Sequence, residues 1–176
     1  MESIAAVFLA TAIKRFAVHK ELGDKTFAQL QEPDFHFQPN TASNSMAVII
    51  QHMSGNMLSR WTNFLTEDGE KEWRNRDTEF DPQGLSKAQL LALWEKGWAC
   101  LFDALHGLKE EDLLKNIYIR KEAQSVIDAV HRQLAHYSYH VGQLVYLGRL
   151  IKDAQWQGLS IEKGKSADYN RLMENK

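Results

Sequence analysis

Hydrophobic residues recur at steps of three and four along four long stretches of the chain. That spacing places them on one face of an α-helix, with polar residues on the opposite face. Each stretch is therefore predicted to be an amphipathic helix that buries its apolar face in a common core. The predicted helices cover residues 2 to 22, 45 to 66, 86 to 107 and 123 to 152.

Capping residues mark several of these helix ends. Ser86 and Gln89 have the spacing of a capping box, which opens the third helix, and Gly107 stands at its C-terminal end. Gly23 occupies the position where the C-terminal cap of the first helix is expected. These signals predict where the first helix ends and where the third begins and ends.

The connections between the helices differ in length. Residues 67 to 85 are charged and contain Pro82 and Gly84, which predicts a long crossover between the second and third helices. Alternating residues 117 to 120 predict a short extended segment, which we expect to pair with residues 73 to 80. Four amphipathic helices with such a crossover predict an all-α, four-helix bundle. We expect residues 1 to 176 to form a single domain.

Charge and composition exclude several classes of protein. Lys and Arg number 21 against 23 Asp and Glu, so there is no basic surface for a nucleic-acid partner. The apolar run from Ile4 to Ile13 is about half as long as a bilayer-spanning helix, and no secretory signal precedes it. The single cysteine, Cys100, excludes an internal disulfide framework and Cys-rich zinc modules. We therefore expect a cytoplasmic protein without a membrane partner.

Two histidines in the last helix have the spacing of metal ligands. His136 and His140 lie four residues apart, so their rings can reach one ion from adjacent turns. Gln143 lies on the same side of the helix and completes a polar stripe on an otherwise apolar helix. A polar stripe that faces a core needs a partner. The alternative is a set of core histidines whose hydrogen bonds are satisfied without a metal.

A third histidine, His52, lies in the middle of the second helix, with Asn56 one turn further on the same side. It could supply a third nitrogen, and three neutral imidazoles would leave a fourth position on the ion for water or substrate. Such a site lowers the pKa of a bound water or thiol and acts as a Lewis acid. We expect Asn56 and Gln143 to hydrogen-bond the ligand rings or the substrate. Tyr137 follows His136, where metalloproteases place a glutamate, so peptide hydrolysis loses support.

Charged residues elsewhere offer possible contacts to a substrate. Arg74 and Arg76 lie in the crossover, and Lys165 lies in the C-terminal segment. Both segments could cover the site and present positive charge to an anionic substrate. The alternative is that these residues form an ordinary solvated surface.

The amino-acid sequence around these histidines resembles that of the DinB-like superfamily of metalloenzymes, also described as DinB/YfiT-like. The resemblance rests first on residues 136 to 144, which contain the pattern His-x-x-x-His-x-Gly-Gln, and on a helical histidine some eighty residues earlier. Three further stretches resemble an uncharacterised bacterial branch of that family: residues 51 to 61, residues 73 to 80, and residues 159 to 166.

The resemblance implies an up-down-down-up bundle that often forms homodimers. It also implies a divalent metal ion, zinc or nickel, bound by His52, His136 and His140. Some relatives are transferases or isomerases that use low-molecular-weight thiols such as bacillithiol, mycothiol or glutathione. A thiol-dependent transferase acting on a small electrophile is accordingly the first hypothesis for this chain.

Two alternatives remain open, because a shared scaffold does not determine the reaction. A metal-dependent hydrolase would use a bound water in place of the thiol. A non-catalytic dimeric bundle would carry a structural metal or a vestigial histidine cluster.

Overall fold

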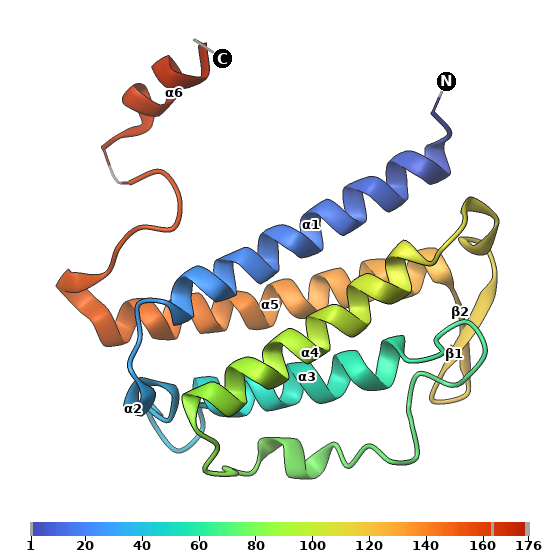
Figure 1. Ribbon diagram of the computed structural model, residues 1–176, viewed down its shortest axis with the longest axis horizontal. Coiled ribbons are helices and arrows are strands. Elements are labelled where there is room, and N and C mark those ends of the chain that lie inside the picture. Colours follow the sequence, from blue (N-terminus) through green and yellow to red (C-terminus); the bar gives the residue numbers. More distant parts are fainter. Residues whose placement is uncertain (1, 163, 175–176) are drawn as a thin grey trace.

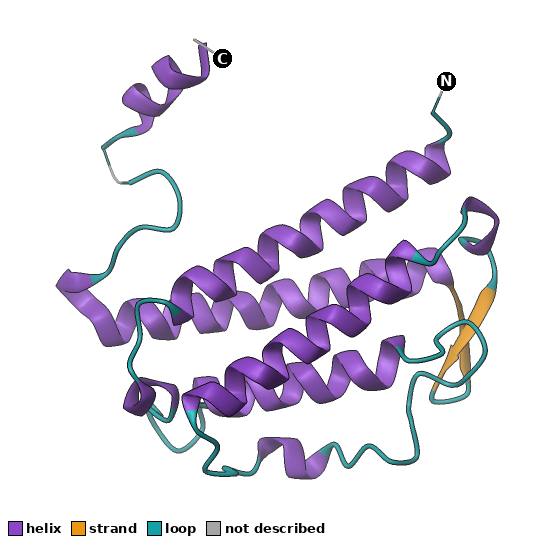
Figure 2. Cartoon of the chain, viewed as in Figure 1, coloured by secondary structure: helices purple, strands orange, loops and turns teal. Residues whose placement is uncertain are grey.

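Four long helices lie side by side and form the body of the protein (Figure 1). The computed structural model describes residues 2–162 and 164–174. The predicted all-α class is confirmed, with the addition of one small antiparallel hairpin (Figure 2). The four long helices are α1 (Ile4–Phe27), α3 (Met46–Trp61), α4 (Lys87–His106) and α5 (Val126–Lys152).

Shorter elements occupy the connections and the C-terminal segment. In Figure 1 the last helix stands away from the four long helices, and it buries none of its residues. None of the helices in the described ranges combines the length and apolar character that crossing a bilayer requires. The shorter elements are α2 (Glu32–Phe35), η1 (Asp77–Phe80), η2 (Glu110–Asp112), β1 (Asn116–Ile119), β2 (Glu122–Ser125), η3 (Asp153–Gln155) and α6 (Ser166–Glu174).

The long crossover determines how the helices are ordered. It carries the chain from the end of α3 back to the end where α3 began, so α3 and α4 run in the same direction (Figure 1). Helices α1 and α5 run in the opposite direction (Figure 1). The main helix contacts are α3 with α4 and α1 with α5, and α3 also contacts α5. The contact between α3 and α5 positions the candidate site.

An aromatic cluster fills the space between the helices. The ring of Phe16 lies 6.5 Å from Trp61, 6.4 Å from Trp98 and 6.0 Å from Tyr137, measured between centroids. All four residues are buried. Because Tyr137 points into this cluster, the rotation of α5 about its own axis is defined by aromatic packing. The neighbouring residues of α5 then face α3.

Serine residues cap the helices that carry the site. The Ser45 hydroxyl accepts a hydrogen bond from the Val48 amide at the start of α3, and Ser125 does the same for Asp128 in α5. The predicted capping box of Ser86 is present in α4, which ends at its cap Gly107.

Helix α1 continues through Gly23 to Phe27, so the prediction of a C-terminal cap at Gly23 was wrong. The glycine is needed for close packing. A Cβ atom at this position would lie 2.3 Å from Cζ2 of Trp94 in α4. Trp94 also donates a hydrogen bond from Nε1 to Asp24 Oδ1 at 2.7 Å. The sequence cannot distinguish these two uses of glycine, because the second depends on a residue in another helix, α4.

The second helix is shorter than predicted, since α3 ends at Trp61 and not near residue 66. Asn63 has a φ of 48°, in the left-handed region, which turns the chain out of the helix. Its carbonyl oxygen accepts hydrogen bonds from the amides of Thr66 and Glu67, and these close a turn. A local turn therefore replaces the predicted last helical turn.

The extended segment at residues 117 to 120 is present, but its predicted partner was wrong. It pairs with β2, which takes residues that were predicted to begin the last helix. Arg120 and Lys121 both have positive φ values, 56° and 64°, as a two-residue hairpin turn requires. Asp68 of the crossover accepts hydrogen bonds from both of their amides, at 2.8 and 2.7 Å. The crossover therefore stabilises the hairpin turn without pairing through residues 73 to 80.

The close packing at Gly23 is testable. We expect Gly23→Ala to lower the free energy of unfolding by about 1–3 kcal/mol, because the added methyl group would overlap buried Trp94. Urea denaturation followed by circular dichroism measures the change.

Gly142→Ala is the matched control in α5, where a Cβ would meet no heavy atom within 4 Å. Higher helix propensity should make this variant neutral or more stable, by up to about 1 kcal/mol. Equal destabilisation of the two variants would contradict the packing role of Gly23.

Candidate metal centre

Three histidines from two helices meet between α3 and α5. His52 lies in the middle of α3, and His136 and His140 lie one turn apart on α5. Each offers one ring nitrogen, and the three nitrogens lie within 4.8 Å of one another. The structure thus brings together the three histidines singled out from the sequence, although His52 and His136 are 84 positions apart.

The separations between the ring nitrogens suit a single ion. Nε2 of His136 lies 3.0 Å from Nε2 of His140 and 3.4 Å from Nε2 of His52. Nitrogens that bind a tetrahedral zinc ion at about 2.0–2.1 Å are separated from one another by roughly 3.3 Å. The two observed distances lie on either side of this value, so the residues present fit a divalent ion.

Hydrogen bonds define the tautomer of two of these rings. Nδ1 of His52 donates to Oε2 of Glu79 at 2.9 Å, and Nδ1 of His140 donates to Oε1 of Gln143 at 2.8 Å. A ring that donates from Nδ1 in its neutral form has its lone pair on Nε2. Both Nε2 lone pairs are therefore available at the point where the rings converge, as ligation requires.

Burial favours the neutral form of the two imidazoles on α5. It lowers the pKa of His136 to about 3, with further contributions from the nearby His140 and His52. The pKa of His140 is also lowered, chiefly by burial, although its hydrogen bond to Gln143 opposes the shift. Neutral rings are the form that binds metal.

Glu79 is the residue of this site that the sequence did not reveal. Its side chain is 10% exposed, and both of its oxygens accept hydrogen bonds from Arg74, at 2.7 and 2.9 Å. Burial alone would raise the pKa of this carboxyl, but the hydrogen bonds from His52 and Arg74 lower the pKa below its usual value. Glu79 is thus a charged acceptor that orients His52 and is itself held by Arg74.

Two contacts of Glu79 and one of its neighbour Phe80 hold this part of the crossover over α3. A Cβ at Gly55 would lie 2.2 Å from Oε1 of Glu79, so only glycine leaves room for the carboxylate. Gln51 Nε2 donates to the backbone oxygens of Glu79 and Asp81, at 3.3 and 3.1 Å. The ring of Phe80 lies 4.8 Å from the ring of His52. A glycine inside a helix, where it costs about 1 kcal/mol relative to alanine, was the available sequence signal.

Gln143 and Asn56 make different contacts in the site. Gln143 contacts His140 directly. Asn56 Oδ1 instead accepts a hydrogen bond from the Tyr137 hydroxyl at 2.9 Å, and that hydroxyl accepts one from Trp61 Nε1 at 3.1 Å. Asn56 therefore anchors the residue that follows His136 in the chain, and it also lines a cavity next to His52 and His136.

The three charged residues predicted to contact a substrate lie in different places. Arg74 is buried against Glu79, and Arg76 lies over the ring of Phe80, 5.1 Å from its centroid. Lys165 is exposed and lies 3.7 Å from Asp168 in the C-terminal segment. Among the described residues, none of that segment lines the two cavities next to the histidines.

A protein-family model described as "Protein of unknown function (DUF1572)" matches residues 3–165. The chain belongs to the DUF1572 family. No curated protein and no solved structure matches it. The family assignment carries no activity of its own, so the chemistry of this DUF1572 protein has to be argued from the site.

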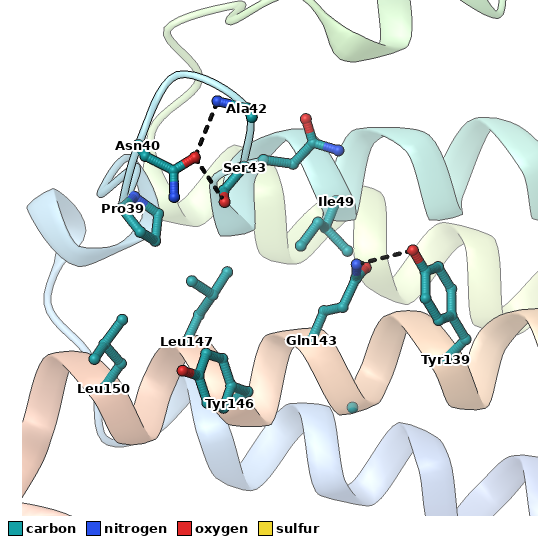
Figure 3. A pocket seen from close by; sticks show the side chains of 12 residues that line it. Pro39, Asn40, Ala42, Ser43, Ile49, Tyr139, Gln143, Tyr146, Leu147 and Leu150 are labelled. Atoms are coloured by element: carbon teal, nitrogen blue, oxygen red, sulfur yellow. Dashed lines mark hydrogen bonds between the residues drawn. The ribbon is translucent and has the colours of Figure 1, made fainter.

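Two cavities open next to the histidines of this DUF1572 protein. The larger, of about 680 Å³, lies between α5 and residues 39–44, which precede α3 (Figure 3). Gln143 and Tyr139 project into it side by side, and Gln143 Nε2 donates to the Tyr139 hydroxyl at 3.1 Å (Figure 3). The smaller, of about 240 Å³, is lined by His52 and His136 themselves. The smaller cavity thus opens directly onto two of the three histidines, whereas the larger one is lined by Gln143, which contacts His140.

The orienting role of Glu79 can be measured through metal affinity. We expect Glu79→Gln to weaken zinc binding by about 10–100-fold, because a neutral amide holds the Nδ1 proton of His52 less strongly. Gly55→Ala should act in the same direction, because its methyl group displaces the carboxylate. Competition against a chromophoric chelator gives the affinities.

Asp77→Asn is the control, since it removes a carboxylate that is 97% exposed in the same helical turn η1. It should bind zinc like the wild type. If Glu79→Gln bound as tightly as Asp77→Asn, Glu79 would have no orienting role.

Proposed function

We propose that this protein is a metal-dependent enzyme in which His52, His136 and His140 bind one divalent ion, zinc or nickel. The observation that carries the proposal is the convergence of three Nε2 atoms, two of them with Nδ1 committed to an acceptor. Without an ion, a single Nε2 proton on His136 would have to serve two converging lone pairs, 3.0 and 3.4 Å away, whereas a divalent ion satisfies all three nitrogens.

The number of ligands favours catalysis over a structural role. Within the described residues, the cluster contains three histidines and no fourth His, Cys, Asp or Glu. Structural zinc sites are normally closed by four protein ligands, whereas catalytic sites keep one position open. A divalent ion bound here would supply Lewis acidity and lower the pKa of a thiol or water nucleophile.

We further propose that the protein is a DinB-like bundle with up-down-down-up order. Support comes from the DUF1572 match, from the four long helices with α3 parallel to α4 (Figure 1), and from the His-x-x-x-His-x-Gly-Gln pattern. A homodimer is part of the same proposal.

The nucleophile that the site suits best is a low-molecular-weight thiol, transferred to a small electrophile. A thiol has an ordinary pKa of about 8.5, against 15.7 for water, so it needs far less activation. The carboxylate beside the cluster, Glu79, is already held by His52 and Arg74, and its lowered pKa makes it a poor general base. Hydrolases of the metalloprotease type use a free carboxylate as general base, which makes a hydrolase the weaker alternative.

The metal site is tested by elemental analysis of protein purified without a histidine tag. We expect about one divalent ion per chain in the wild type and loss of the ion in His52→Ala and in His136→Ala. His131→Ala is the matched control, because His131 lies on the same helix α5 and packs on Phe8. Wild-type protein that takes up neither zinc nor nickel would rule out the proposal.

The reaction is tested with bacillithiol, mycothiol or glutathione and a small electrophile. We expect the metal-loaded protein to consume the thiol, and His140→Ala to abolish turnover, while His131→Ala retains it. Turnover of ester or amide substrates without a thiol would favour the hydrolase. A metal-loaded protein inactive in both assays, whose only response to chelation is a lower melting temperature, would indicate the non-catalytic bundle.

A further inference from the structure

Five arginines surround the smaller cavity next to the histidine cluster. The cavity of about 240 Å³ has His52 and His136 in its wall, so any molecule in it lies against two of the three proposed ligands. The arginines that line it are Arg60, Arg74, Arg76, Arg120 and Arg132.

These arginines come from separate parts of the chain. Arg60 lies on α3 and Arg132 on α5, whereas Arg120 belongs to the hairpin turn. Arg74 and Arg76 belong to the crossover. Arg60 and Arg74 are buried, with side chains 7% and 2% exposed, while the other three are exposed at the rim. The arginines at the mouth of the cavity are therefore exposed to solvent, and those at its base are buried.

Carboxylates neutralise only part of this charge. Glu70 lies 2.9 Å from Arg60, 3.2 Å from Arg120 and 3.6 Å from Arg74. Glu79 pairs with Arg74 alone among the arginines. Two carboxylates thus form ion pairs with three of the guanidinium groups. The same network of ion pairs connects the crossover to α3 and to the hairpin.

The remaining two arginines lie outside that network. Arg76 lies 4.0 Å from Asp77, whose side chain is almost fully exposed, and Arg132 has no ion-pair or hydrogen-bond partner among the described residues. Asp68 also interacts with the charge of Arg60, so with Asp77 counted the five arginines face four carboxylates and the cavity keeps an excess of one positive charge. The ion-pair network does not account for Arg132, and Arg76 is held only by Asp77 and by the ring of Phe80, 5.1 Å away.

Buried polar atoms in the cavity wall also lack partners. Arg60 Nε and Arg74 Nη1 are inaccessible to solvent and make no hydrogen bond, although Arg74 Nη1 lies 3.6 Å from Glu70 Oε2 in an ion pair. Oε1 of Gln133 is likewise without a partner, and Gln133 is only 3% exposed. Oxyanions are the acceptors that guanidinium groups bind best, so the exposed guanidinium groups of Arg76 and Arg132 are the donors open to an anion in the cavity.

From these observations we propose that the cavity binds an oxyanion of the substrate, a carboxylate or phosphate group, and holds it beside the metal centre. The substrate is accordingly an anionic small molecule. The cavity is smaller than the roughly 300–1,000 Å³ of sites that enclose a drug-sized ligand, so it takes the anionic group and leaves the rest of the molecule outside. The assignment rests on the proposed function, because it makes the cavity part of the same active site.

The test measures anion binding by the full-length protein by isothermal titration calorimetry, with and without bound zinc. Two probes are used: inorganic phosphate stands for a phosphate group of the substrate, and malonate stands for a carboxylate. We expect saturable binding of at least one probe to the metal-free wild type in the millimolar range, weakening as salt is added.

Arg132→Gln is the diagnostic variant, because Arg132 is exposed and supports no other part of the fold. We expect it to weaken binding of the probe about tenfold, and Arg76→Gln combined with it to weaken binding further. Arg149→Gln is the matched control, an exposed arginine near the other end of α5 that lines a different cavity. It should bind like the wild type.

The outcomes separate this inference from the proposed function. If the metal-free wild type bound neither probe, or if Arg132→Gln bound as well as Arg149→Gln, the anion site would be excluded even in a protein that binds zinc. If anion binding depended on Arg132 but no metal were taken up, the anion site would stand and the metal-dependent enzyme would fail. A preference for phosphate over malonate, or the reverse, identifies which oxyanion the substrate carries.

Discussion

The buried contact of Glu79 with His52 and Arg74 is the interaction on which the rest of the site depends. It joins the crossover to α3, because Glu79 comes from the crossover and His52 from the helix. Removing one partner of such a buried ion pair typically costs about 3–5 kcal/mol, since the other charge is left uncompensated. The contact also places the proton of His52 on Nδ1. One carboxylate therefore determines both where the crossover lies and which nitrogen of His52 faces the other histidines.

The surrounding electrostatics follow from that arrangement. Burial favours the neutral form of His136 and His140, and the carboxylates that approach the cluster are already bound to arginines. A divalent ion at the cluster would add positive charge to a region that already has an excess of arginines. Such a region attracts anionic groups and favours the ionised form of a nucleophile such as a thiol. The proposed thiol chemistry and the proposed oxyanion site share this physical basis.

Aromatic packing supplies the rigidity that the cluster needs. Tyr137 is fully buried among Phe16, Trp61 and Trp98, and its hydroxyl is held by Asn56 and Trp61. Because His136 precedes Tyr137 in the same helix, the core defines the direction of the histidine side chains. A metal centre on two well-packed helices loses little entropy when it binds an ion.

Helical periodicity was enough to predict the four long helices, the capping box at Ser86 and the shared face of His136, His140 and Gln143, because each depends on residues within a few turns. The strand partner of residues 117 to 120, the packing of Gly23 on Trp94 and the role of Glu79 were not predictable in this way. Each depends on a contact between chain segments whose relative position no local pattern encodes. The same holds for the arginines around the small cavity, which four separate segments contribute. The sequence by itself determined which residues could bind a metal. Only tertiary packing decided which of them meet and which charges surround them. The reason is that hydrogen bonds and ion pairs act over a few ångströms of space, whatever the distance along the chain.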